Sequence, residues 1–402
     1  MNRIAESYVK LVLAVGQHDS DYVDAYYGPP EWRTEAEARK RPLGEIRSEA
    51  VALLSDLQAL PPATGGQDAE LVRLRHDYLT RQLQSMVARL DLLSGKRLSF
   101  DEESKALYDA VAPTHDAAYF QEVIDQLDTL LPGDGPVVEQ LERFRAGFVI
   151  PKDRLDTVFR AAVAECRRRT LEHIELPAGE SFEIEYVTDK PWGGYNWYKG
   201  NFHSLIQVNT DLPIYIERAI DLACHEGYPG HHVYNALLEK HLVRDRGWPE
   251  FSVYALFSPQ SLIAEGTANY GIEVAFPGDE RVEFEKKVLF PLAGIDPTEA
   301  DRYYQGLRLG RKMIYAGNEA ARGYLDGKLT QEQAVDWLMR YVLMPRNRAE
   351  QRIRFFDKYR SYVINYNLGQ DLVKEYVERR GGDRWEEFEK LLSSPRLPSE
   401  LK

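Results

Sequence analysis

Three of the nine histidines fall within eight residues and stand beside a glutamate. The stretch reads His225-Glu-Gly-Tyr-Pro-Gly-His-His232. Imidazole and carboxylate groups are common ligands of catalytic zinc. In the pattern His-Glu-x-x-His, two histidines one helical turn apart bind zinc and the glutamate acts as a general base. The stretch therefore indicates a metal-dependent hydrolytic centre.

The spacing differs from that pattern, because Pro229 occupies the fifth position. His231 follows His225 by six residues, which on a straight helix means about 9 Å of rise and roughly 240° of rotation. His232 returns to the same face but lies about 10.5 Å along the axis. The proline and its flanking glycines favour a bulge, which would bring His231 to the second ligand position with the smaller distortion. The alternative is a Gly-Pro-Gly kink with incidental histidines.

A candidate third ligand lies further along the chain. Glu265 belongs to a predicted helix, Ser261–Glu273, and the residues on its N-terminal side are apolar or small. Burial of a lone carboxylate is costly, so Glu265 is expected to be paired or bound to a metal. Glu273 lies about 80° further around this helix and cannot point to the same place. We predict Glu265 as the third ligand and Glu273 as a structural or supporting carboxylate.

The elements before the histidines would position them. A helix is predicted over Asp211–Cys224, with an N-capping aspartate and an early proline. Alternation with period two predicts strands at Glu183–Val187 and Phe202–Asn209. The aromatic, glycine-rich stretch Pro191–Gly200 between them is typical of a surface hairpin or a substrate-contacting loop. A small β-sheet is thus expected next to the metal-binding helix, where a strand can hold an extended peptide.

The remaining chain has a helical pattern, which makes the predicted fold class mainly α. Residues 1–150 form a predicted N-terminal helical region without recognisable chemistry. Residues 151–402 form the predicted catalytic region, unless the two make one continuous domain. Further helices are predicted at 2–15, 43–60, 68–93, 103–111, 117–131, 135–146, 280–292, 298–316, 330–343 and 346–368.

Composition excludes several functions. The chain has 402 residues, and its 64 acidic and 51 basic side chains leave a net charge of −13. This balance argues against nucleic acid or an anionic membrane as the partner. No apolar run approaches the length of a membrane span, and charged residues near the start are atypical of a signal peptide, so a cytoplasmic location is expected. Cys166 and Cys224 cannot build a disulfide framework, and Cys224 is more simply a small buried residue than a nucleophile.

The motifs resemble a bacterial family known as domain of unknown function 885, which is grouped with the gluzincin metallopeptidases. That family carries His-Glu-x-x-Pro-Gly-His-His, which matches fully here. Its Glu-Gly-Trp-Ala-Leu-Tyr appears as Glu265-Gly-Thr-Ala-Asn-Tyr270, with Thr267 and Asn269 departing from it, and its Tyr-Lys-x-Gly appears as Tyr366-Asn-Leu-Gly369. The resemblance implies a gluzincin-like helical body over residues 150–370.

The resemblance also implies roles. It makes His225, His231 and Glu265 the ligands of one zinc ion per chain, and Glu226 the general base. We therefore expect a zinc-dependent hydrolase of peptide or amide bonds, of carboxypeptidase-like type and acting on short peptides through activated water. Additional catalytic candidates are His232, Tyr270 and Tyr366, and candidates for substrate binding are Arg354, Tyr362 and His203. The alternatives are an inactive metal-binding or interaction protein with the same fold, and a thiol hydrolase that uses Cys224. The sequence does not indicate an oligomeric state.

Overall fold

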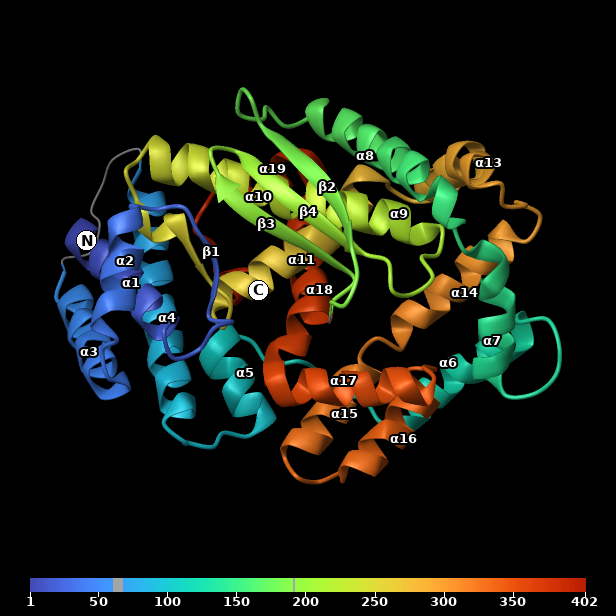
Figure 1. Ribbon diagram of the computed structural model, residues 1–402, viewed down its shortest axis with the longest axis horizontal. Helices are drawn as coiled ribbons and strands as arrows, with labels where there is room; N and C mark the ends of the chain where they lie inside the picture. Colours follow the sequence, from blue (N-terminus) through green and yellow to red (C-terminus); the bar gives the residue numbers. More distant parts are fainter. Residues whose placement is uncertain (61–67, 191) are drawn as a thin grey trace.

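Helices form most of the chain in this computed structural model, which describes residues 1–60, 68–190 and 192–402 (Figure 1). The prediction of a mainly α fold is confirmed. The helices before the sheet are α1 (Asn2–Val15), α2 (Pro30–Arg39), α3 (Leu43–Gln58), α4 (Ala69–Leu93), α5 (Phe100–Tyr108), α6 (Ala117–Leu130), α7 (Val137–Arg145) and α8 (Leu155–Leu171).

The helices after the sheet carry the predicted chemistry. They are α9 (Glu217–Leu222), α10 (His231–Leu238), α11 (Pro259–Ala275), α12 (Glu280–Phe284), α13 (Phe290–Ala293), α14 (Ala300–Lys312), α15 (Ala316–Leu325), α16 (Gln331–Tyr341), α17 (Arg346–Tyr359), α18 (Ile364–Arg379) and α19 (Arg384–Leu392). Segments of π-helix follow α9, α10 and α12, at Ala223–Gly227, Glu239–Arg244 and Glu285–Leu289. None of the helices in the described ranges combines the length and apolar character that a bilayer span requires.

Two small sheets support the site. The first contains β2 (Ser181–Val187), β3 (Gly194–Gly200) and β4 (His203–Asn209) in the order β2-β4-β3, with β2 parallel and β3 antiparallel to β4. The two predicted strands are confirmed, and β3 lies within the predicted aromatic stretch, whose Pro191 is outside the described residues. The second sheet pairs β1 (Val23–Tyr26) with β5 (Val253–Ala255). The predicted N-terminal helical region thus also contributes one short strand, β1.

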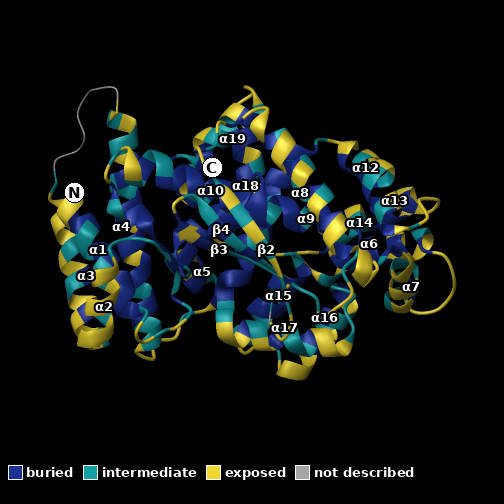
Figure 2. Ribbon diagram, turned by 45° about the horizontal axis from the view of Figure 1, so that its top comes forward, coloured by how far each residue is buried: buried dark blue, intermediate teal, exposed yellow. Residues whose placement is uncertain are grey.

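The apolar core continues across residue 150. It includes Tyr8 and Leu83 from the first part of the chain together with Leu262 and Leu401 from the second. A buried hydrogen bond from the Tyr78 hydroxyl to Gln260 Oε1, 2.8 Å long, also joins the two parts. Figure 2 shows exposed residues concentrated on α2, α3 and α7, and buried residues on α10 and α18. Helices α10 and α18 are thus enclosed by the rest of the chain.

Helices α11 and α18 touch backbone to backbone in the centre of the molecule (Figure 1). A Cβ on Gly266 would lie 2.4 Å from the Gly369 carbonyl oxygen, and a Cβ on Gly369 would lie 2.7 Å from that of Leu262. Only glycine fits at both positions. This contact brings α11 and α18 together, so that Glu265 on α11 and Tyr366 on α18 lie near one another.

Two predicted helices have different limits in the structure. The helix predicted over Asp211–Cys224 begins at Glu217, because Tyr215 forms a β-bridge with Val149 and the Ile214 carbonyl accepts a hydrogen bond from the Ile150 N–H. The helix predicted over 346–368 is divided at Arg360, where φ is 50°. There the buried Glu103 carboxylate accepts hydrogen bonds from the Arg360 side chain and from the next backbone N–H. Tertiary partners for backbone and side chain overrode the local helical pattern in both places.

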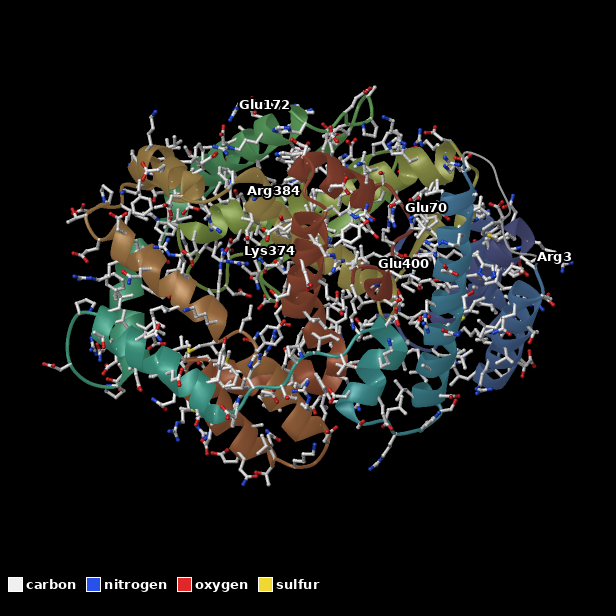
Figure 3. All side chains as sticks on the ribbon, turned by 180° about the vertical axis from the view of Figure 1, so that it is seen from behind. Arg3, Glu70, Glu172, Lys374, Arg384 and Glu400 are labelled. Atoms are coloured by element: carbon white, nitrogen blue, oxygen red, sulfur yellow. The ribbon has the colours of Figure 1, made fainter. Side chains whose placement is uncertain are left out.

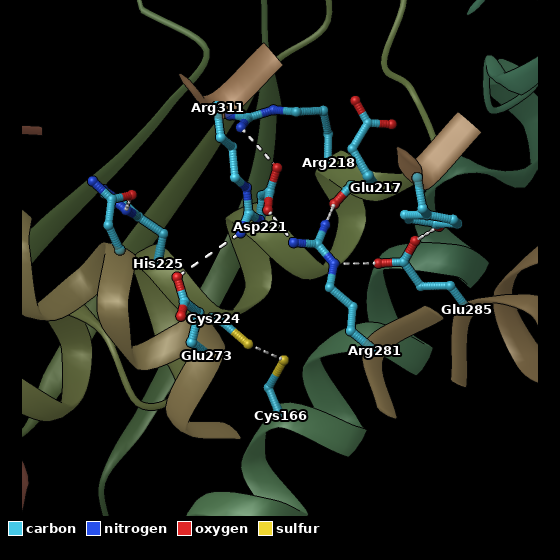
Figure 4. A network of polar contacts seen from close by, with 12 residues as sticks. Cys166, Glu217, Arg218, Asp221, Cys224, His225, Glu273, Arg281, Glu285 and Arg311 are labelled. Atoms are coloured by element: carbon cyan, nitrogen blue, oxygen red, sulfur yellow. Dashed lines mark hydrogen bonds and ion pairs between the residues drawn. The ribbon is translucent and has the colours of Figure 1, made fainter. Parts of the chain in front are cut away.

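A buried ion network holds α9, the helix that leads to His225 (Figure 4). The guanidinium of Arg281, on α12, contacts Asp221 at 2.8 Å, Glu285 at 2.7 Å and the Glu217 carbonyl at 2.7 Å. The Glu285 side chain is fully buried, so its carboxylate depends on this arginine for charge compensation. Arg281 therefore attaches α9 to α12.

We predict that Arg281→Met lowers the free energy of unfolding by about 3–5 kcal/mol, because it leaves the buried Glu285 carboxylate without a cation. The control is Arg346→Met, which removes an exposed ion pair with Glu332 and should cost about 0–1 kcal/mol. Urea denaturation followed by circular dichroism measures both. Equal, small losses for the two variants would contradict the assigned role of the network.

Candidate metal centre

The histidine stretch contains the predicted bulge. The helix widens into the π-helical segment Ala223–Gly227, and α10 begins at His231. The rings of His225 and His231 consequently lie with their centroids 4.6 Å apart and their planes 88° to one another. The prediction that a bulge brings these two side chains together is confirmed, and a straight helix could not do so.

Gly230 allows the chain to close this bulge. Its N–H donates to the Cys224 carbonyl at 2.9 Å. A Cβ at this position would lie 2.0 Å from the His225 carbonyl oxygen and 2.3 Å from that of Cys224. Any side chain would therefore push α10 away from the preceding segment. Glycine is required here because two backbone segments touch.

Glu265 completes a three-sided arrangement. Its Oε2 lies 3.4 Å from Nε2 of His225 and 3.9 Å from Nε2 of His231. Ligand bonds of 2.0–2.1 Å in a tetrahedral zinc site place neighbouring ligand atoms about 3.3 Å apart. The other oxygen, Oε1, accepts a 2.9 Å hydrogen bond from the Tyr362 hydroxyl. Oε2 is buried and has no hydrogen-bond donor among the described residues, as expected for an oxygen that faces a cation.

Glu226 lies at the same centre. One ligand atom each from His225, Glu226 and His231 falls within 4.8 Å of the others. The Glu226 carbonyl accepts a 2.6 Å hydrogen bond from Asn196 Nδ2 on β3, which holds this turn against the sheet. A Cβ on Gly194 would lie 2.9 Å from Glu226 Oε1, so this glycine leaves room for the carboxylate. Either Glu226 or Glu265 is thus close enough to serve as third ligand.

The electrostatics of the centre favour a positive charge. Burial lowers the pKa of His225, but the Glu226 and Glu265 carboxylates outweigh it and raise this pKa to about 9. Burial lowers the pKa of His231 to about 4, with a contribution from His225. Burial raises the pKa of Glu226 to about 7. The side chains of His225 and His231 remain 16% and 14% exposed, so solvent reaches them.

Asn269 orients His225. Its Oδ1 lies 3.0 Å from His225 Nδ1, and its Nδ2 donates to the Tyr366 carbonyl at 3.0 Å. Because the carbonyl oxygen of Asn269 can only accept, Nδ1 must carry a proton, which leaves Nε2 as the ring nitrogen that can bind a metal ion. The sequence analysis treated Asn269 as a departure from the family pattern, whereas the structure gives it a hydrogen-bonding role.

His232 belongs to a separate network beneath the sheet. Its Nδ1 lies 2.8 Å from Ser204 Oγ on β4, and its Nε2 lies 2.9 Å from Glu180 Oε2. Glu180 also accepts hydrogen bonds from Tyr228 and Arg167. Both ring nitrogens are therefore occupied, and the side chain is fully buried. The structure does not bring His232 to the centre as a donor for a reacting oxygen.

The predicted aromatic residues divide into two groups. Tyr362 contacts Glu265 directly, and the Tyr366 ring lies 5.7 Å from that of Tyr362. Burial raises the pKa of Tyr366, and the Glu265 and Glu226 carboxylates add to this rise, which places its hydroxyl in their field. Tyr270 lies about 140° around α11 from Glu265. It packs on Phe388 of α19 instead, so it is not brought to the centre.

Three other predicted residues also lie elsewhere. His203 is on the face of β4 opposite to the buried Ser204, with its Nδ1 3.1 Å from Ser181 Oγ. Arg354 is exposed on α17. Glu273 pairs with Lys374 at 2.7 Å on the rear of the molecule, where Figure 3 labels that lysine. Its expected structural role is confirmed.

The sequence analysis missed Asp24, which lies near the centre. Asp24, on β1, accepts a hydrogen bond from the Tyr195 hydroxyl on β3. Burial raises the pKa of Asp24 to about 6, and Glu265 contributes to this rise. No local pattern marks this residue, because long-range packing alone brings it here. Arg352, on α17, is half-buried.

Cys224 faces Cys166 of α8 rather than the centre (Figure 4). The two sulfur atoms are 2.8 Å apart, and both residues are fully buried. Burial raises the pKa of the Cys166 thiol, and Cys224 adds to the rise. The expectation that Cys224 is a small buried residue is confirmed.

Comparison with known proteins identifies only the fold. No family model matches the chain, and no curated protein does. A solved structure of a putative lipoprotein from Colwellia psychrerythraea matches with a TM-score of 0.55 and 15% identity, over 90% of this chain and 68% of that one. A putative lipoprotein of unknown function from Shewanella oneidensis matches with a TM-score of 0.48 and 13% identity, over 92% and 74%. At these identities, the Colwellia protein shares the fold and nothing further is transferred from it.

Proposed function

We propose that the protein is a zinc-dependent hydrolase of peptide or amide bonds, with a gluzincin-like catalytic region. His225, His231 and Glu265 would hold one zinc ion per chain. The observation that carries this proposal is the buried Glu265 Oε2, which has no hydrogen-bond donor among the described residues and lies near both imidazole nitrogens. Three imidazole and carboxylate ligands suit a zinc ion that keeps a fourth coordination position open for water or substrate.

Glu265 is the better third ligand and Glu226 the better base. Glu265 directs one oxygen to the histidines while Tyr362 holds the other. Glu226 lies beside the histidines, and its raised pKa of about 7 suits a group that accepts and returns protons near neutral pH. When bound, zinc would polarise the scissile carbonyl and acidify water. Glu226 would take the proton of that water and pass it to the leaving amine, with Tyr366 as a candidate donor to the reacting oxygen.

The proposed substrates are short peptides, with carboxypeptidase-like removal of a terminal residue. The burial of α10, α11 and α18, which surround the centre, supports small substrates over folded proteins. The alternative proposal is a metal-binding or interaction protein without turnover. The cytoplasmic location also remains a prediction. The Colwellia protein is described as a putative lipoprotein, but it shares only the fold with this chain, so its description says nothing about where this chain is located.

Purified, untagged protein should contain about one equivalent of zinc by elemental analysis. His231→Ala should lose the ion, because it removes a ligand. His232→Ala should keep it, because Ser204 and Glu180 occupy both nitrogens of that ring. Zinc far below one equivalent in wild-type protein, with no rebinding, would refute the metal site, and the reverse histidine pattern would refute the ligand assignment.

Glu226→Gln should retain zinc and the fold but lose about 10²- to 10⁴-fold in hydrolysis rate, since it removes the base while preserving size. Glu265→Gln is the matched comparison and should weaken zinc binding, because it replaces a charged ligand. Peptide turnover and zinc affinity are measured on both variants. A Glu226→Gln protein with near wild-type turnover would exclude the mechanism.

Asn269→Leu should weaken zinc binding about 10- to 100-fold, because nothing would then hold the Nδ1–H of His225. Asn269→Asp keeps an accepting oxygen for His225 Nδ1 but replaces the donor to Tyr366 with a second, charged oxygen, so it should bind zinc far better than the leucine variant. Competition with a chromogenic chelator measures the affinities. Equal losses in the two variants would show that Asn269 acts through Tyr366 rather than through His225.

A further inference from the structure

Arg352 differs from its neighbours on α17. Arg346 pairs with Glu332 and Glu350 at the surface, and Arg354 is exposed. Arg352 is half-buried, and no Asp or Glu oxygen in the described part of the chain lies within 4.0 Å of its guanidinium. Burial lowers its pKa, and the Tyr366 hydroxyl opposes this. In a chain of net charge −13, an inward-facing arginine without a carboxylate partner is unusual.

A continuous line of aromatic rings joins Arg352 to the metal centre. Its guanidinium carbon lies 4.7 Å from the centroid of the Phe355 ring, which lies 4.7 Å from that of Tyr359. Tyr359 lies 6.2 Å from Tyr362, whose hydroxyl donates to Glu265. Arg352 also acts electrostatically on the Tyr366 hydroxyl. The Arg352 guanidinium therefore lies near the residues that surround the proposed ligands, on the side formed by α17 and α18.

Asp24 is a second charged group near the centre. Its carboxylate accepts a hydrogen bond from Tyr195 on β3, the strand that touches Glu226 through Gly194. No Lys, Arg or His nitrogen of the described residues pairs with this carboxylate. Asp24 repels a negatively charged ligand, whereas Arg352 attracts one.

A half-buried guanidinium without a counter-ion loses hydration, and stacking on aromatic rings compensates for only part of that loss. A carboxylate is its natural partner, because the planar fork of arginine binds both oxygens at once. The Phe355 and Phe356 rings, 4.7 and 5.6 Å from the guanidinium carbon, support it and limit its motion. A ligand carboxylate would supply the charge compensation that the chain does not.

We propose that Arg352 binds the C-terminal carboxylate of a short peptide substrate and so makes the centre specific for removal of the C-terminal residue. This inference rests on the proposed hydrolase function and names its substrate class. One water is consumed: the C–N bond breaks, the acyl carbon gains the hydroxyl group, and the amine of the released amino acid gains the proton. Arg352 is a binding residue and takes no part in the proton transfer.

The experiment compares pairs of N-acetylated tripeptides that end in a free acid or in an amide. Wild-type enzyme should prefer the acid. Arg352→Met should lower the acid-to-amide ratio of kcat/KM about 10- to 100-fold, as expected for hydrogen bonds between charged groups. The loss should be mainly in KM, because the contact exists before and during reaction. Arg354→Met, which removes an exposed arginine of the same helix, should leave the ratio unchanged.

Several outcomes would contradict the proposal that Arg352 is the anchor for the substrate carboxylate. One is an unchanged ratio in Arg352→Met, and another is equal cleavage of acid and amide by wild type. Cleavage of the same tripeptides only when their amino terminus is left free would instead assign recognition to that terminus. Arg352→Lys provides a second variant if the methionine protein fails to fold: it keeps the charge but not the fork, so it should retain part of the preference.

A binding measurement separates this inference from the proposed function. If wild type hydrolyses no peptide, the hydrolase proposal fails, and the anchor is tested alone by calorimetric titration with N-acetylphenylalanine and its amide. Tighter binding of the acid by wild type, lost in Arg352→Met and kept in Arg354→Met, supports the anchor. Equal binding of acid and amide by wild type refutes it.

Discussion

The burial of the Glu265 carboxylate is the constraint on which the rest of the centre depends. An ionised carboxylate removed from water needs a cation or several donors. Tyr362 provides one donor to Oε1, while Oε2 faces only two imidazole nitrogens. Those nitrogens present lone pairs when they act as ligands, so the arrangement is stable only with a positive charge at its centre. Without a bound cation, the neighbouring carboxylates raise the pKa of His225 to about 9, so that this histidine takes up a proton and carries the positive charge.

The scaffold places these groups by close backbone contacts. At Gly230 the chain folds back against the carbonyls of Cys224 and His225, and at Gly266 and Gly369 two helices meet without side chains between them. The first contact brings His231 beside His225. The second sets the distance of Glu265 from Tyr366. Each contact requires glycine for a steric reason, so the same residues that allow the fold also determine the spacing of the chemistry.

Charge around the centre is distributed unevenly, and this distribution limits the chemistry that it can perform. Asp24, Glu226 and Glu265 face it from β1, the histidine turn and α11, whereas Arg352 approaches from α17. The three carboxylates suit a bound cation, and the single arginine suits a ligand carboxylate. Elements distant in sequence supply the opposing charges, which explains why the polarity of the site emerges only in the folded chain.

The sequence alone determined the local features. Residue types and periodicity indicated the helical class, the strands β2 and β4, the bulge at the histidines and the burial of Glu265, since these depend on neighbours within a few residues. Tertiary structure decided the rest. Long-range packing placed Asn269 behind His225, enclosed His232 with Glu180, turned Tyr270 toward α19 and exposed Arg354 while half-burying Arg352. Residues two apart on one helix share the same propensity, but about 200° of rotation separates their directions, and only the surrounding helices decide which one faces the interior.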